Sequence, residues 1–243
     1  MTARTIKHLV TMTTLAAALA AAGCSGGSTD SGSDNPYNPQ IPTNWVSAVT
    51  NPYFPLVTGT TYQYQGQTAE GVETVTVEVL PGTKMVNGVA ATIVRDRVYL
   101  DGALIEDTAD WYAQDGAGNV WYLGEDSKEI ANGVVVGTEG SWEWEVDDAL
   151  PGIIMWGDPA AHVGEEYRQE FYEGEAEDWA KIVAVDQSVD VPEGNFTGCI
   201  KIEEWSGLEP SQREYKFFGP QIGNVLEIST NGERSELVSR TTP

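Results

Sequence analysis

Short runs of alternating apolar and polar residues fill this chain and restrict what it can fold into. Examples are residues 74–79 (TVTVEV) and 91–100 (ATIVRDRVYL). A period of two places successive side chains on opposite faces of a β-strand, whereas helical periodicity is hard to find after residue 23. The runs are rich in Val, Ile, Thr, Tyr and Trp, which pleated sheets favour. The pattern predicts an all-β protein.

Turn-forming residue pairs separate these runs. Asn87-Gly88 and Asn132-Gly133 each stand between apolar runs, and Asn-Gly is the strongest short-range sign of a hairpin. Other turn pairs are Pro81-Gly82, Asp101-Gly102, Glu193-Gly194 and Asn231-Gly232. Strands joined by such tight turns predict antiparallel meanders.

The chain also echoes itself at a separation of 103 to 106 residues. The matched positions are Gly59 with Gly164, Gly88 with Gly194, Tyr112 with Tyr215, and Gly118 with Gly223. We expect two internally repeated β halves, at residues 45–157 and 158–243. Together they would form one large curved sheet, a half-barrel or a barrel, which removes exposed strand edges. Two side-by-side sandwiches are the alternative.

The N-terminus has the three-part layout of a secretion signal. Arg4 and Lys7 supply positive charge, an apolar stretch follows, and small residues precede Cys24. The order resembles the lipobox of bacterial lipoproteins, in which this cysteine is acylated and becomes the new N-terminus. Here Ala21 stands where Leu is usual. The alternative is ordinary secretion with a free N-terminal cysteine.

We therefore expect a signal peptide at residues 1–23 and a tether at 24–44 that is rich in Gly, Ser, Asp and Pro. Ser25 follows the predicted anchor, and an Asp-type retention signal is absent. By resemblance to sorted lipoproteins, this favours a lipid-anchored position in the cell envelope, at the outer membrane or outer surface.

The mature chain is strongly acidic. It keeps all 37 acidic residues and loses two of the 13 basic ones with the signal. Such a surface repels nucleic acid and anionic headgroups, so we expect no nucleic-acid partner and membrane contact through the lipid anchor alone. The spread of the acids along the chain favours a role in solubility over binding of calcium.

Few residues are suited to catalysis or to metal binding. His162 is the single histidine after the signal, and Cys199 stands alone in a strand-like run as a small hydrophobe. With so few histidines and cysteines, the mature chain cannot form a multi-histidine or cysteine-rich zinc site. The turn at residues 115–119 lacks the acidic spacing of a calcium loop, and the acidic stretch at 173–178 is better explained as a solvated hairpin, so we expect no cofactor.

Two segments are candidates for contact with a ligand or partner. Residues 149–159 (ALPGIIMWGDP) form either an exposed apolar loop or, as we favour, a buried connector. Residues 142–145 (WEWE) put two Trp rings on one strand face, either in the core, as we favour, or beside carboxylates in a carbohydrate-binding groove. The candidate contact residues are Trp142, Trp144, Ile153, Ile154, Met155 and Trp156.

Three segments carry a resemblance to a known family. NPYFPLVTGTTYQY, DWYAQDGAGNVWYLGE and VDVPEGNFTGCIKIEEW resemble bacterial secreted proteins and lipoproteins that open with a YFPL-type strand and contain a V-P-x-G-x-F hairpin. A looser similarity is to lipoprotein-carrier half-barrels, which hold acyl chains against a concave sheet. The resemblance implies a fold and carries over no catalytic residue. We expect a non-enzymatic role in binding an apolar ligand or an envelope protein, or a structural role.

Overall fold

The computed structural model describes residues 37–243 and consists almost entirely of antiparallel sheet. The predicted signal peptide and Cys24 lie outside the described residues. One short 3-10 helix, η1 (Pro159–His162), is the helical element of the described part. The all-β prediction is confirmed. Within residues 37–243, no helix has the length and apolar character needed to cross a membrane.

The first meander begins the sheet. Its strands are β4 (Thr61–Gln67), β5 (Val72–Val86), β6 (Val89–Leu100), β7 (Ala103–Asp115) and β8 (Val120–Asp126), each antiparallel to the next. Asn87 and Gly88 join the long strands β5 and β6, and both have positive φ, at 42° and 80°. This is the backbone that a primed two-residue hairpin turn requires, as the Asn-Gly pair predicts.

A second meander follows and closes onto the first. It comprises β15 (Asp178–Val191), β16 (Gly194–Ser206), β17 (Glu214–Gly219), β18 (Gly223–Ser229) and β19 (Arg234–Thr241). The last strand, β19, pairs with β4 in a register that runs from Ser235 opposite Gly66 to Thr241 opposite Thr61. This pairing leaves neither meander with a free edge on that side.

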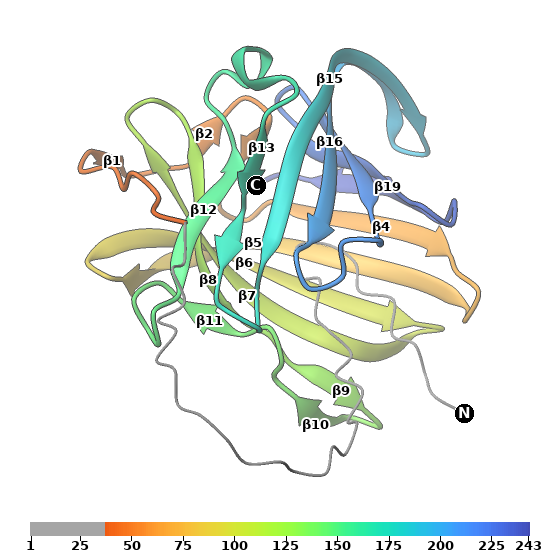
Figure 1. The fold of residues 1–243 in the computed structure, drawn as a ribbon. Coiled ribbons are helices and arrows are strands. Elements are labelled where there is room, and N and C mark those ends of the chain that lie inside the picture. The colour runs from red at the N-terminus through yellow and green to blue at the C-terminus, as the bar shows by residue number, and fades with distance from the viewer. Residues whose placement is uncertain (1–36) are drawn as a thin grey trace.

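The other junction between the meanders is a seam. Strand β12 (Leu150–Met155) pairs with β8 on one side and meets β14 (Glu170–Phe171) through two residue pairs on the other. Strand β13 (Glu166–Arg168) pairs with β15 and completes the circuit. The sheet is thus nearly closed into a barrel with one seam (Figure 1), within the range of architectures predicted.

Several short strands lie outside the two meanders. A short hairpin of β2 (Thr50–Asn51) and β3 (Phe54–Pro55) forms a separate two-stranded sheet. The remaining strands are β1 (Trp45–Val46), β9 (Glu129–Ala131), β10 (Val134–Gly137) and β11 (Trp142–Glu143). Strands β9 and β10 form a hairpin that projects from the barrel (Figure 1).

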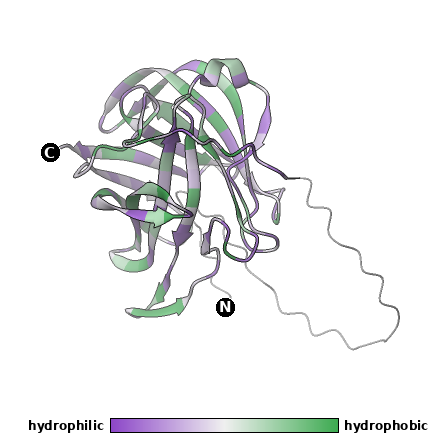
Figure 2. Ribbon diagram, turned by 90° about the vertical axis from the view of Figure 1, so that its left-hand side faces the viewer, coloured by the Kyte–Doolittle hydropathy of each residue, from purple (hydrophilic) through white to green (hydrophobic). Residues whose placement is uncertain are grey.

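Alternation along the long strands builds the core. In β5 and β6, every second residue is buried over 73–79 and 94–98, and hydropathy alternates along the ribbons in Figure 2. Most of these inward residues are Val, and they join the hydrophobic core cluster. Two of them, Glu73 and Asp96, are charged, and Asp96 leads to the candidate site.

Two predictions about segments can be compared with the structure. Tyr37, within the predicted tether, donates a hydrogen bond to the Pro151 carbonyl at 2.8 Å, so packing against the barrel begins earlier than residue 45. Gly59 and Gly164, one pair of the internal echo, both have a φ of 87° and donate their N–H to a strand carbonyl. The repeat itself stays a prediction.

Candidate functional site

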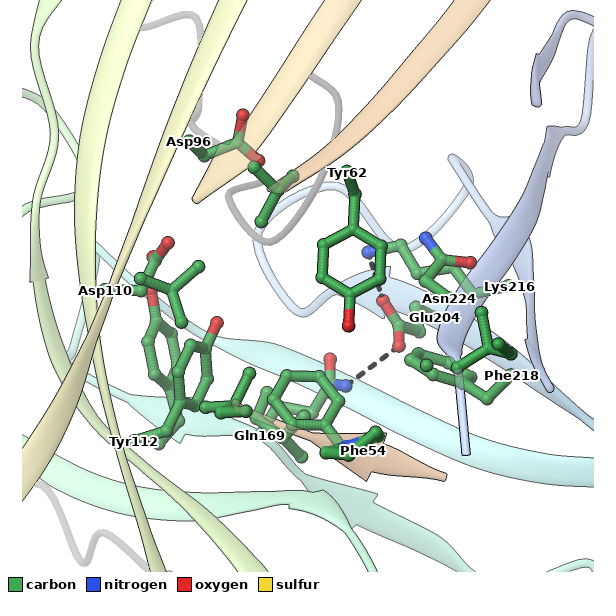
Figure 3. A pocket seen from close by; sticks show the side chains of 18 of the residues that line it. Phe54, Tyr62, Asp96, Asp110, Tyr112, Gln169, Glu204, Lys216, Phe218 and Asn224 are labelled. Atoms are coloured by element: carbon green, nitrogen blue, oxygen red, sulfur yellow. Dashed lines mark hydrogen bonds and ion pairs between the residues drawn. The ribbon is translucent and has the colours of Figure 1, made fainter. Parts of the chain in front are cut away.

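The barrel contains a cavity of about 80 Å³. Part of its lining is apolar and aromatic, including Tyr62, Val94, Tyr112 and Phe218. Carboxylates and one ammonium group form the rest of the wall, so the cavity combines an apolar surface with buried charge (Figure 3). A pocket of this composition is the usual form of a small-molecule site.

Buried acids on successive strands form an acid belt around the inside of the barrel. Strand pairing explains their proximity: Asp110 lies directly opposite Glu125, and Asp96 lies opposite Thr108, two residues from Asp110 on the same face. The acid belt consists of Asp96 on β6, Asp110 on β7, Glu125 on β8, Glu170 on β14, Asp178 on β15, Glu204 on β16 and Glu227 on β18, all at most 6 % exposed.

Lys216, on β17, is the one cationic residue that is buried in the part of the chain described. Its Nζ lies 2.7 Å from Oε2 of Glu204 and 2.9 Å from Oε1 of Glu214. Gln169 donates a further hydrogen bond to Oε1 of Glu204 at 2.9 Å. These contacts give the carboxylates on the β16–β17 side of the cavity a cationic partner. Desolvation lowers the pKa of Lys216, but the negative carboxylates around it together outweigh this effect and raise the pKa well above its usual value.

In another part of the acid belt, at Asp110, Glu125 and Glu170, the hydrogen-bond donors are neutral side chains. The Tyr122 hydroxyl donates to Oδ1 of Asp110 at 2.7 Å and also contacts Glu125. The indole Nε1 of Trp142 donates to Oε2 of Glu170 at 2.6 Å. These bonds leave the carboxyls without a cationic partner.

Burial is the main influence on protonation in the acid belt. Desolvation raises the pKa of Asp110 to about 7, although the Tyr122 hydrogen bond opposes it. Desolvation likewise raises the pKa of Asp178 to about 8, against a hydrogen bond from Ser206. The pKa values of Asp96 and Glu125 are raised well above their ordinary values, first by desolvation and then by neighbouring acids. Several of these carboxyls are therefore protonated at neutral pH.

Several acids of the belt have one buried oxygen without a hydrogen-bond partner among the described residues, and Asp96 is the one acid of the belt that has two. It is 3 % exposed, lines the cavity, and neither carboxyl oxygen has a hydrogen-bond partner among the described residues. In Figure 3, Asp96 and Asp110 lie on one side of the pocket, and the Glu204–Lys216 pair lies on the other. Buried carboxyls normally have partners, so this one marks a functional candidate.

The β2–β3 hairpin covers part of the cavity. The Phe54 ring packs against Tyr112 and Phe218, with ring centroids 5.1 and 6.2 Å apart. The side chain of Asn51 holds the hairpin in place by donating to the carbonyls of Gly118 and Trp156 at 2.8 and 3.0 Å. The YFPL-type segment therefore acts as a plug that contributes Phe54, Pro55 and Leu56 to the lining.

The predicted contact segment at 149–159 is not an exposed loop. Ile153, Ile154 and Met155 belong to strand β12 and are at most 6 % exposed, and Trp156 is partly buried. The exposed-loop interpretation is wrong because both faces of this strand are covered. Ile154 alone among the four lines the cavity.

The two Trp residues of the WEWE segment are also interior. Trp142 and Trp144 are 5 % and 7 % exposed and belong to the hydrophobic core cluster. This core position is the interpretation that the sequence favours. The alternative, a carbohydrate-binding groove at these residues, is excluded because their rings cannot stack on a sugar from solvent. Trp142 instead supports the cavity indirectly, by its bond to Glu170.

The turn at residues 115–119 uses its carboxylate internally. Asp115 accepts hydrogen bonds from the backbone N–H groups of Ala117 and Asn119 through Oδ1, and from Trp121 through Oδ2. No group of three or more His, Cys, Asp or Glu side chains in residues 37–243 is arranged to hold a metal ion. Cys199 is fully buried, as predicted for a small hydrophobe.

Sequence reasoning missed the acid belt. A signal was present: in VRDRV, Asp96 occupies the apolar phase of an alternating strand, between Val94 and Val98. Glu204 similarly follows Ile200 and Ile202 at a spacing of two. Acids in the inward phase of a strand point into the core, and this pattern could have identified them.

Comparison with known proteins gives structural likenesses only. No family model and no curated protein sequence matches this chain. A crystal structure from Bacteroides fragilis, described as an exported protein with a YmcC-like fold, is similar with a TM-score of 0.47 and 14 % identity, covering 78 % of this chain and 99 % of that chain. A lipoprotein structure from Parabacteroides distasonis has a TM-score of 0.43 and 12 % identity over 78 % of this chain and 98 % of that chain.

Proposed function

We propose that this protein is a lipid-anchored extracytoplasmic lipoprotein that binds a small ligand inside its barrel without transforming it. The predicted signal and Cys24 support the anchor. The cavity supports binding, because apolar walls and a few inward polar groups provide both burial and orientation for a ligand. An envelope protein as the partner has less support, since the apolar segment predicted to contact it is buried.

The observation that carries the proposal is an interior that is only partly filled by side chains. Side chains fill the interior of a small closed barrel, whereas a larger barrel can enclose a ligand cavity. Here Asp96, whose two carboxyl oxygens have no hydrogen-bond partner among the described residues, is one of the residues that line a cavity of about 80 Å³, together with aromatic rings and other acids. An inward polar group beside open space costs stability and is retained where a ligand uses it.

Filling the cavity tests the proposal. The mature chain would be expressed without lipid, as a Cys24→Ser variant, and titrated by NMR with small compounds such as 2-methylpropan-1-ol and 2-methylpropylamine. We expect chemical-shift changes at residues around the cavity, including Ile154 and Tyr112. The Val94→Phe variant, which places a ring in the cavity, should weaken binding at least tenfold.

The control is Val135→Phe, on the exposed β9–β10 hairpin, which should leave binding unchanged. Loss of binding in both variants, or no binding by the parent chain to any of these compounds, would contradict the proposal. Anchoring is tested separately in the full chain: Cys24→Ser should move the protein from the membrane to the soluble fraction.

A further inference from the structure

We propose that the cavity binds the protonated amino group of a small apolar amine against Asp96 and Asp110. This inference rests on the proposed function, because it names the ligand class for the same cavity. The ammonium group donates to the inward carboxylate oxygens, and the hydrocarbon part lies against the aromatic wall.

The distribution of charge in the acid belt supports a cationic ligand. On the β16–β17 side, the Lys216 ammonium already lies between the carboxylates of Glu204 and Glu214, at 2.7 and 2.9 Å. On the β6–β7 side, Asp96 and Asp110 have no cation within salt-bridge distance among the described residues. The protein thus places its own primary ammonium on one side of the cavity and leaves the equivalent acids on the other without one.

Hydrogen-bonding capacity points to the same ligand. A carboxylate accepts hydrogen bonds through both oxygens, and both oxygens of Asp96 have no partner in residues 37–243. An ammonium group brings three donors and no acceptor, which matches these unpartnered acceptor oxygens. A ligand with acceptors of its own would face carboxylate oxygens and gain less.

The rest of the lining fits a short hydrocarbon chain. Phe54, Tyr62 and Tyr112 present aromatic rings, whose faces attract cations and whose bulk excludes water. An apolar cavity of about 150 Å³ is known to hold benzene, so a cavity of about 80 Å³ suits an amine of roughly three to five non-hydrogen atoms.

Binding of a cation must couple to the protonation of the acid belt. The groups that face Asp96 are Asp110 and Glu106 from β7, Glu227 from β18, Lys216 from β17 and Tyr64 from β4. Burial raises the pKa of Asp110 to about 7, so a bound ammonium displaces a proton near neutrality. Affinity should therefore rise from pH 6 to pH 8.5, while the amine stays protonated.

Calorimetric titration with a matched pair of probes tests the inference. We would compare 2-methylpropylamine with 2-methylpropan-1-ol, which differ in charge and have nearly the same shape. We expect the amine to bind at least tenfold more tightly at pH 8. Asp96→Asn should lose at least that factor for the amine and leave binding of the alcohol unchanged. Asp190→Asn, which alters an exposed acid on β15, should change neither affinity.

The outcomes separate this inference from the proposed function. Equal affinity for the two probes, or amine affinity unchanged in both Asp96→Asn and Asp110→Asn, would overturn the amine assignment and leave the cavity as a binding site. Binding of neither probe would overturn both. If circular dichroism shows that Asp96→Asn does not fold, Asp110→Asn provides the decisive measurement, because its amide oxygen still accepts from Tyr122.

Discussion

At the scale of single residues, the balance between burial and charge at Asp96 determines whether this carboxyl group is protonated or paired with a cation. A buried acid with no hydrogen-bond partner is stable only when protonated or when paired with a cation. Its strand position explains why it points inward: it follows Val94 and precedes Val98 in the same phase. The sequence shows this position, but which acids lie near Asp96 depends on strand register.

Replacing Asp96 by Asn should stabilise the ligand-free protein at alkaline pH. The amide keeps the shape of the side chain and removes the cost of ionising a buried carboxyl, while its N–H₂ group can donate to the facing acids. We expect an increase of about 1–3 kcal/mol in the free energy of unfolding at pH 9, and little change at pH 5. Urea unfolding measures this change. Destabilisation at pH 9, with Asp190→Asn unchanged, would show that Asp96 is stabilised as an anion.

At the scale of elements, alternation predicted the long hairpins correctly and failed for β12. Strands β5 and β6 alternate because each has one inward face and one outward face. In β12, by contrast, Ile153, Ile154 and Met155 are all buried, so both faces are covered and the run loses its period of two. Such a run cannot be distinguished by periodicity from a connector.

The internal echo makes a prediction for two strand-entry turns. Gly59 and Gly164 share a φ of 87°, and an added Cβ would meet only ordinary contacts at Gly59 and open space at Gly164. Replacement by Ala therefore tests backbone strain alone. If the halves are equivalent, each substitution should destabilise the protein by about 1–2 kcal/mol. Thermal unfolding of the two variants measures this, and an effect at only one of the two sites would argue against equivalent roles.

At the scale of the whole molecule, the acid belt sets how stability depends on pH. The folded-state pKa values of Asp110 and Asp178 are raised to about 7 and about 8, above those of the same groups in the unfolded chain. The folded state then holds protons that the unfolded state releases. The corresponding stability is present below about pH 4 and is lost as pH rises toward 7 and 8, by up to about 1.4 kcal/mol per pKa unit of each group.

The melting temperature should therefore fall steadily from pH 5 to pH 9 at constant ionic strength. Asp107, whose pKa Arg95 lowers by a hydrogen bond, acts in the opposite direction but only below about pH 4. The double variant Asp110→Asn with Asp178→Asn should flatten the curve, and Asp190→Asn should not. A melting temperature that is constant or rises over this range would contradict protonated carboxyls inside the barrel.

The most direct test of the central claim is a crystal structure of the mature chain, without its lipid, grown at pH 8 with 2-methylpropylamine. We expect one amine inside the barrel, with its nitrogen within hydrogen-bond distance of Asp96 and its carbons against Phe54 and Tyr62. An empty cavity at saturating amine, or amine bound only on the outer surface, would contradict the claim that this cavity binds an amine against Asp96.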